Sequence, residues 1–429
     1  MTLTAMQKYK TYKWSGNPFF GDIPSCWDIF PLLKVAKIKS IINKQDEELL
    51  SVYLDRGVIK FSDVDEKRTN VTSLDLSKYQ FVENGDFVLN NQQAWRGSVG
   101  VSEYIGIVSP AYLVLSLSKE INSKYANYLF RDGSMVSQYL ICSKGVGTIQ
   151  RNLYWPHLRR TIIALPSYNE QNAIANFLDA KTAQIDEAIA IKEQQIALLN
   201  ERKQTLIQQA VTQGLDPTVP MKNSGVAWIG KIPEHWQVKR LKFVLDERSE
   251  RSLTGEEPLF MVSQQYGLVV RADYHEKAVV AASNIDSKIV YKNDLVFNKL
   301  KAHLGVFFKS NMDFKGLVSP DYAVYKVKDY ISDTKILELL FRNPLYIEQF
   351  TIRATGIVEG LIRLYTSDLF DISIPIAPRE EQLEILVHIE KMSVLFDKAI
   401  EIHREQCEKL KEYKTTLINS AVTGKIKVV

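Results

Sequence analysis

The chain has 429 residues, of which 45% are hydrophobic and 24% charged, and its formal net charge is +4. This length predicts two or three domains with ordinary cores, and the mildly basic balance permits nucleic acid as a partner without requiring it. No run of about 18 apolar residues and no signal-peptide core occur, so we expect a cytoplasmic protein with no membrane partner. Cys26, Cys142 and Cys407 lie far apart, which argues against a disulfide framework and a zinc site.

The sequence contains two copies of one pattern, about 210 positions apart. "SGNPFFGDIPSCW" from Ser15 is answered by "SGVAWIGKIPEHW" from Ser224, and "LIQQAVT" from Leu206 by "LINSAVT" from Leu417. Matching segments between these pairs keep the same order, and their spacing drifts by only two residues. Solenoid repeats are about 20 to 50 residues long, so this spacing indicates a duplicated domain instead.

Each copy begins with a mixture of short alternating strands and brief helices, and then changes to one long helix. "YLVLSL" at Tyr112 and "YAVYKV" at Tyr322 each follow a Ser-Pro turn, which is typical of strands. The fold class that we predict is α+β, with two similar globular domains separated by a pair of long antiparallel coiled-coil helices. The predicted boundaries are 1–165 for the first domain, 166–214 for the first long helix, 215–375 for the second domain and 376–429 for the second long helix.

The limits of both long helices are marked in the sequence. Ser167 or Asn169 can cap the first helix, and the acidic pair after Pro378 has the same place in the second. Gly214 and Gly424 are predicted to end them.

Apolar residues recur every seven positions in both helices. The predicted seam residues are Leu178, Ile185, Ile189, Ile196, Leu199, Leu206, Ile389, Phe396, Ile400, Leu410 and Leu417. Such a seam has to be buried on another helix, and the sister helix matches it in length. Lys203 and Lys414 interrupt the seam at equivalent positions, and we expect their stems to extend to water. A helix of about 41 residues is roughly 60 Å long, which predicts one domain at each end of a spacer.

Catalytic motifs are missing from the sequence. "NPFF" at Asn17 is similar to the tetrad with which amino-methyltransferases hold a flipped base, but it lacks the second proline, and the second copy reads "VAWI" there. No glycine-rich cofactor loop or phosphate loop accompanies it, and the histidines are scattered. We therefore expect a packed turn at Asn17, and no catalytic residue, metal or cofactor.

The duplicated architecture resembles the specificity subunit of type I restriction-modification systems. The resemblance rests on the order of the motifs "SGVAWIGKIPEHW", "LPSYNEQNAIANFLDAKTAQID" and "IAPREEQLEILVHIEKMSVLFD", and it covers essentially the whole chain. Only the first opening motif, "NPFFGDIPSCW", departs from the family pattern. The resemblance implies a non-catalytic subunit with two target recognition domains that bind double-stranded DNA. It also implies that the paired helices dock two methyltransferase subunits, which in turn join restriction motor-nuclease subunits.

The predicted spacer leads to a bipartite target without the resemblance. A rod of roughly 60 Å spans fewer than about 18 base-pair steps, so two terminal domains would read two separated elements of one duplex. Because the domains share a scaffold and differ in their loops, the two halves of the target should differ in sequence.

DNA contacts are expected on loops that differ between the copies. The first pair is "NQQAWRGSVG" from Asn91 and "KLKAHLG" from Lys299, which is three residues shorter. The candidates there are Asn91, Gln92, Gln93, Arg96, Lys299, Lys301 and His303. Amides suit adenine edges, and the basic residues suit guanine or phosphate, although solvated loops are an equal alternative. Weaker candidates, for which ordinary turns are the alternative, are Lys144, Gln150, Arg151, Arg353, Thr355 and Arg363.

Residues that both copies share are expected to build the scaffold. Trp27 and Trp236 are predicted to anchor the domains, and base stacking is the alternative. Two other functions stay open from the sequence: a self-contained modification enzyme, which lacks its motifs here, and a coiled-coil scaffold with two protein-binding heads.

Overall fold

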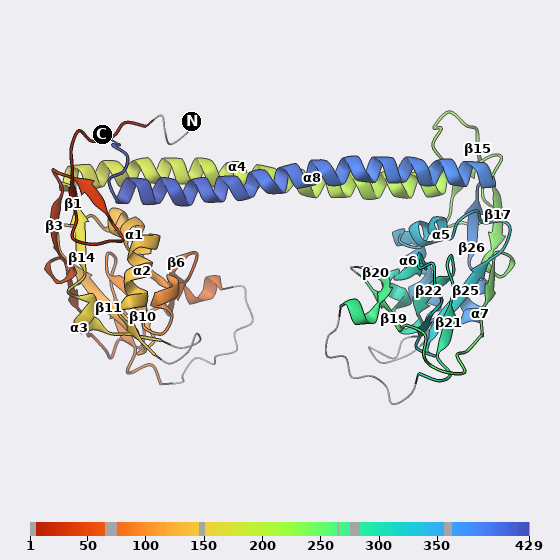
Figure 1. Cartoon of the computed structure of the whole chain (residues 1–429), viewed down its shortest axis with the longest axis horizontal. Helices are drawn as coiled ribbons and strands as arrows, with labels where there is room; N and C mark the ends of the chain where they lie inside the picture. Colours follow the sequence, from red (N-terminus) through yellow and green to blue (C-terminus); the bar gives the residue numbers. More distant parts are fainter. Residues whose placement is uncertain are drawn as a thin grey trace. The chain divides into compact units, whose positions relative to one another are not determined.

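The computed structural model describes residues 6–64, 75–145, 151–264, 266–274, 284–355 and 363–428. They form two compact units, one of Met1–Glu193 with Arg404–Val429 and the other of Gln194–His403. Each unit contains one α+β domain and parts of both long helices (Figure 1). The prediction of two similar α+β domains with paired long helices is confirmed, whereas the exact domain boundaries stay a prediction.

A four-stranded antiparallel sheet lies at the centre of the first domain. Its order is β4 (Ala36–Ile38), β11 (Tyr112–Leu117), β8 (Phe87–Asn90) and β9 (Val99–Val101). The antiparallel pairs around it are β1 (Tyr12–Trp14) with β2 (Asp22–Pro24), β3 (Asp28–Pro31) with β14 (Ile162–Leu165), β5 (Leu50–Tyr53) with β6 (Gly57–Lys60), β7 (Gln80–Val82) with β10 (Gly106–Val108), and β12 (Ser143–Lys144) with β13 (Asn152–Leu153). The helices of the domain are α1 (Ser123–Arg131), α2 (Gly133–Ile141) and α3 (Trp155–Leu158).

The second domain repeats this plan. Its central sheet has the order β18 (Leu245–Glu247), β25 (Tyr322–Val327), β22 (Leu295–Asn298) and β23 (Phe307–Lys309). The surrounding pairs are β15 (Met221–Asn223) with β16 (Lys231–Pro233), β17 (Gln237–Arg240) with β26 (Ser373–Ile376), β19 (Phe260–Ser263) with β20 (Gly267–Val270), and β21 (Lys288–Val290) with β24 (Gly316–Val318). The helices are α5 (Lys335–Leu340), α6 (Pro344–Arg353) and α7 (Thr366–Phe370).

The loops after β8 and β22 have the same length. Leu89 pairs with Val99 in the first domain, and Phe297 pairs with Phe307 in the second, so equal stretches connect the paired strands. The expectation that the first loop is three residues longer is therefore wrong. The last residues of "NQQAWRGSVG" run into β9 and do not lengthen the loop.

The tryptophans of the opening motifs belong to the scaffold, as predicted. Trp27 and Trp236 are 0% and 1% exposed, and their indole nitrogens donate to Glu170 and Glu381, at the starts of the two long helices. Asn17 is also buried, because its side-chain amide donates to the Gln138 side chain at 2.7 Å and to the Ile162 carbonyl at 2.9 Å. The "NPFF" segment is thus a packed turn.

The long helices are α4 (Tyr168–Gln213) and α8 (Arg379–Val422). The Ser167 hydroxyl accepts a hydrogen bond from the Glu170 backbone at 3.3 Å, which confirms Ser167 as a cap. Gly214 and Gly424 follow the helices with φ of 80° and 73°, the left-handed conformation that suits a helix end. No helix in the described part of the chain is long and apolar enough to span a membrane.

All eleven predicted seam residues are buried or half-buried. In the first unit, the start of α4 packs on the end of α8, with Leu178 and Leu417 in one core. In the second unit, the end of α4 packs on the start of α8, around Val211 and Ile389. The two helices therefore run antiparallel within each unit. The seam follows from the heptad pattern, because the apolar stripe of each helix is shielded from water when it packs against the other helix.

The lysines that interrupt the seam each pair with an aspartate of the other helix. Lys203 pairs with Asp397 at 2.7 Å in the second unit, and Lys414 pairs with Asp186 at 2.6 Å in the first. The two ion pairs occupy equivalent positions of the duplicated sequence. Both lysines extend out of the seam to partly exposed aspartates, and the pairs give the helix contact a matching polar register.

Candidate nucleic-acid interface

Two segments of the first domain that the sequence nominated separately are adjacent in the structure. The Leu153 backbone N–H, in β13, donates to the Asn91 carbonyl at 3.0 Å. Lys144, in β12, lies opposite Asn152 in the same strand pair. The loop after β8 and the β12–β13 pair therefore form one continuous polar surface.

The loop after β8 is held by its own hydrogen bonds. The Asn90 side chain accepts from the Gln92 backbone at 3.2 Å, and the Gly97 backbone donates to the Ala94 carbonyl at 2.8 Å. Gly97 has φ of 102°, which a side chain would strain. Ala94 is fully buried and fastens the loop to the core. A rigid backbone of this kind holds its exposed side chains in defined places.

The side chains of this loop differ in exposure. Gln92 and Arg96 are exposed, whereas Asn91 and Gln93 are half-buried. Gln92 and Arg96 therefore have the freest access to a ligand, and the amide of Gln93 can act beside them.

Trp95 was missed as a site residue in the sequence reasoning. Its indole N–H donates to the Gln92 carbonyl at 3.0 Å. The guanidinium of Arg96 lies 4.9 Å from the centre of the indole ring, and that of Arg151 lies 5.7 Å from it. We call Trp95, Arg96 and Arg151 the Trp95 cluster. The signal available in the sequence was an aromatic residue directly before an arginine, inside a loop that differs between the copies.

A second cation lies on an aromatic ring nearby. The Lys144 ammonium is 4.0 Å from the centre of the Tyr154 ring, and both side chains are exposed. Contacts of this kind stabilise a cation without neutralising it. Gln150, the remaining candidate of this segment, lies outside the described residues.

The second domain builds its corresponding loop in the same way. The Leu364 backbone donates to the Lys299 carbonyl at 3.1 Å, and Thr355 pairs with Arg363 as Lys144 does with Asn152. The Asn298 side chain accepts from the Leu300 backbone at 3.0 Å, as Asn90 does in the first domain. The same backbone contacts thus present different side chains.

Most described candidates of the second domain have internal partners. Lys299 lies 3.7 Å from Glu247, and Arg363 lies 3.2 Å from Asp321. Arg353 donates to the side chain and carbonyl of Gln349.

Two further candidates complete this loop. Lys301 is exposed, and the side chain of His303 lies outside the described part of the chain.

Burial, and then the neighbouring charge of Lys299, lowers the pKa of Lys288 beneath the loop.

A cavity of about 850 Å³ in the first unit adjoins Arg96. It lies between the domain and the helix pair, and charges of both signs line it, among them Arg131, Asp179 and Lys414. Burial lowers the pKa of Arg131. The described residues contain no group of three side chains that could hold a metal ion.

The chain is thus a duplicated protein, in which two domains share a backbone plan and differ in the side chains of their exposed polar loops. Residues 24–201 match the family model of the type I restriction modification DNA specificity domain. The chain is 24% identical to the type I restriction enzyme MjaVIII specificity subunit of Methanocaldococcus jannaschii, over 95% of this chain and 94% of that protein. It is 22% identical to the putative MjaX specificity subunit of the same organism, over 95% of each chain.

Solved structures agree with these relatives. A chain from a structure of the assembly and conformational transition of a type I R-M system has a TM-score of 0.66 at 14% identity, covering 93% of this chain and 98% of that one. The HsdS subunit of Thermoanaerobacter tengcongensis has a TM-score of 0.53 at 16% identity, covering 94% and 98%. Sequence, fold and family model together show that this chain is similar to the specificity subunits of type I restriction-modification systems.

Proposed function

We propose that this chain reads a bipartite, asymmetric target on double-stranded DNA, one half through each domain. The observation that carries the proposal is the pair of equivalent hydrogen bonds from Leu153 to Asn91 and from Leu364 to Lys299. They support two loops of equal length whose side chains differ almost throughout. A shared backbone with different side chains suits two readers that dock alike and recognise different bases.

The residues proposed to contact DNA are those predicted from the sequence, with Trp95 added. In the first domain, Gln92 and Gln93 offer amides for adenine edges, and Arg96 offers a guanidinium for guanine or phosphate. In the second domain, Lys301 is the exposed cation of the corresponding loop. The proposed full set is Asn91, Gln92, Gln93, Trp95, Arg96, Lys144, Gln150, Arg151, Lys299, Lys301, His303, Arg353, Thr355 and Arg363.

The helix pair is proposed to space the two domains and to dock methyltransferase subunits, two of them, which bring restriction subunits to the complex. Two features support this proposal. Each of α4 and α8 contributes residues to both compact units. In the second unit, α8 also exposes apolar side chains, with Val387 at 65% and Val394 at 62%, which a partner protein can cover.

Exchange of one loop tests the DNA-reading proposal. Because the loops have equal length, residues 91–96 can be replaced by the sequence of residues 299–304 while Asn90 and Gly97 are kept. Genomic methylation is then mapped in cells that express the chain with its methyltransferase. We expect one half of the methylated target to change and the other half to remain. The reciprocal graft into residues 299–304 is the matched control, and it should change the other half. A change in both halves, or in neither, would contradict the proposal.

A further inference from the structure

We infer that the two domains hold DNA unequally: the Trp95 cluster of the first domain binds the phosphate backbone of the duplex, and the sequence of the second domain does not repeat the cluster at the equivalent positions. This inference rests on the proposed DNA-reading function. It adds a division of the binding energy between the domains, and it assigns Trp95 the part of a positioning residue.

The cluster is built before any ligand arrives. The Trp95 indole is fixed by its bond to the Gln92 carbonyl, and Ala94 beside it is buried. One ring then faces two guanidinium groups, 4.9 Å and 5.7 Å from its centre. Holding two long side chains on one ring removes part of the conformational entropy that they would lose on binding. The two arginines are thus preorganised for binding a ligand.

The charge of the cluster is not neutralised from within. In the part of the chain that the structure describes, neither Arg96 nor Arg151 forms an ion pair with a carboxylate, and the buried Nε of Arg151 has no hydrogen-bond partner. Two like charges on one small patch repel each other, and a polyanion relieves that repulsion. The contact with the indole stabilises the cations and leaves their charge in place.

The second domain replaces each member of the cluster. By the common register of the loops, His303 stands in the place of Trp95, and the apolar Leu304 in the place of Arg96. Arg151 corresponds to Ile362, which lies outside the described residues. Of the cations that occur in this region, Lys299 and Arg363 are paired with Glu247 and Asp321, and Lys301, at the position of Gln93, is exposed. At the three positions of the cluster, the first domain therefore has two arginines on an indole ring, whereas the second domain has His303, Leu304 and Ile362.

Phosphate is the ligand that fits the cluster. The forked guanidinium group binds the oxygens of a phosphodiester in a bidentate manner. The amides of Gln92 and Gln93 next to the cluster suit base edges. A backbone contact beside a base-reading loop fixes the register of the protein on the duplex, and it supplies affinity that does not depend on sequence.

The salt dependence of binding tests the inference. The dissociation constant of the purified full chain for a mixed-sequence DNA duplex is measured over a series of KCl concentrations. Each lost phosphate contact lowers the slope of log K against log salt by about 0.9. We expect the double variant Arg96→Gln/Arg151→Gln to lose about two units of slope. The matched double variant Lys299→Gln/Arg363→Gln should lose less than about one.

The role of Trp95 is tested with two variants. Trp95→Phe keeps an aromatic face and should retain most of the affinity, whereas Trp95→Ala should weaken binding about tenfold, in line with the loss of a cation–π contact. Thermal unfolding of each variant shows whether the fold is intact. Equal slopes for the two double variants, or wild-type affinity in Trp95→Ala, would overturn the inference and leave the DNA-reading proposal standing. Absence of any salt-dependent binding by the wild-type chain would overturn both.

Discussion

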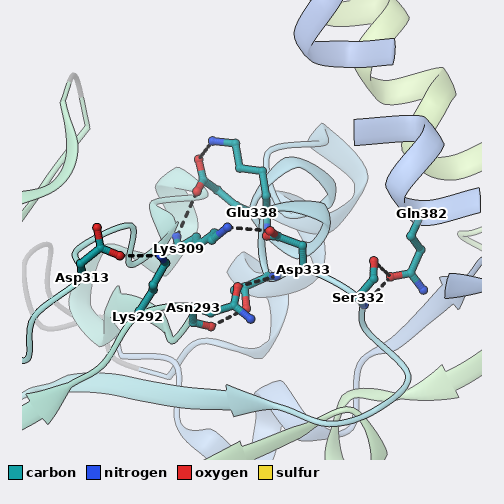
Figure 2. Close-up of polar contacts among 10 residues, drawn as sticks. Lys292, Asn293, Lys309, Asp313, Ser332, Asp333, Glu338 and Gln382 are labelled. Atoms are coloured by element: carbon teal, nitrogen blue, oxygen red, sulfur yellow. Dashed lines mark hydrogen bonds and ion pairs between the residues drawn. The ribbon is translucent and has the colours of Figure 1, made fainter. Parts of the chain in front are cut away.

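The Gln382 side-chain oxygen accepts hydrogen bonds from both the backbone N–H and the hydroxyl of Ser332, at 2.9 and 3.0 Å (Figure 2). Its amide nitrogen donates to the carbonyls of Tyr330 and Ala377, each at 2.8 Å. Gln171 makes the corresponding contacts with Asn122, Glu120 and Pro166 in the first unit. Gln171 and Gln382 are 1% and 2% exposed. One buried glutamine thus fastens the start of each long helix to its own domain.

Replacement of this glutamine should loosen the second unit. Gln382→Ala leaves two carbonyls and the Ser332 backbone without a protein partner, and we expect the free energy of unfolding to fall by about 2–3 kcal/mol. Urea unfolding followed by circular dichroism measures the effect. Leu383, on the same turn, is 50% exposed, so Leu383→Ala is the matched control and should change stability by less than about 0.5 kcal/mol. Equal losses of unfolding free energy in both variants would mean that Gln382 does not fasten the helix to its domain.

Glu338 is a buried carboxylate of the second unit whose equivalent in the first unit is the neutral Asn127. Its carboxylate pairs with Lys335 at 2.7 Å and Arg342 at 2.8 Å. It also accepts from the Lys309 backbone at 3.0 Å (Figure 2). Asn127 occupies the equivalent place in the first unit, and its side-chain oxygen accepts from the Val101 backbone at 3.1 Å.

Neutralising Glu338 should destabilise the second unit, because Lys335 and Arg342 then lose their anionic partner. Glu338→Gln can keep the bond to the Lys309 backbone but removes the charge, and we expect a loss of about 1–2 kcal/mol, because Lys335 and Arg342 remain partly in water. Adding Arg342→Gln should recover part of that loss, which a double-mutant cycle in urea unfolding measures. If the loss of unfolding free energy in the double variant equals the sum of the losses in the two single variants, the two residues are not coupled.

The sequence was sufficient for the parts of the fold that local patterns determine. The heptads predicted the helix seam, and Gly214 and Gly424 the helix ends, because periodicity and end signals act over a few residues. Residues that the two copies share were predicted to form the scaffold of the domains. The burial of Trp27 and Trp236 confirms this for the two tryptophans.

Contacts between distant segments were beyond that reasoning. The Trp95 cluster depends on β13 crossing beside the loop after β8, more than fifty residues earlier in the chain, and no local pattern encodes that contact. The ion pair of Lys414 with Asp186 depends on the antiparallel register of two helices, which the heptad pattern leaves open. The loop after β8 was predicted to be three residues too long, because the sequence does not mark Val99 as the start of β9.

Exchanging the charges of one helix ion pair tests whether it contributes to the register. Lys414→Asp or Asp186→Lys alone places like charges next to each other, and each should destabilise the first unit. The double variant Asp186→Lys/Lys414→Asp restores the pair and should recover stability, with a coupling energy of about 0.2–1 kcal/mol because both side chains are partly exposed. The cycle is measured by urea unfolding at low salt, and the coupling should shrink at high salt. A coupling near zero would leave the pair as a surface contact without energetic effect.

Glu257 gives the second unit a local dependence on pH. A hydrogen bond from the Ser252 hydroxyl at 2.6 Å, a backbone hydrogen bond, and then the Lys315 ammonium at 3.0 Å lower the pKa of Glu257 from 4.5 to about 2. A carboxyl group with a lowered pKa in the folded state stabilises that state above its unfolded pKa. The stabilisation is lost as the pH falls toward the folded pKa. The window therefore lies between pH 4.5 and about 2.

Glu257→Gln removes this titration, and hydrogen exchange detects it locally. The Gly255 N–H donates to the Ser252 hydroxyl at 2.8 Å, so protection of that amide reports on the loop. Near neutral pH we expect faster opening of the loop in the variant than in the wild type, and the ratio of the opening equilibria should approach one as the pH falls through the window. Glu256, next in the chain and exposed, provides the control variant Glu256→Gln, whose ratio to the wild type should stay near one throughout. A ratio for Glu257→Gln that does not change with pH would contradict the assignment of the lowered pKa to this carboxylate.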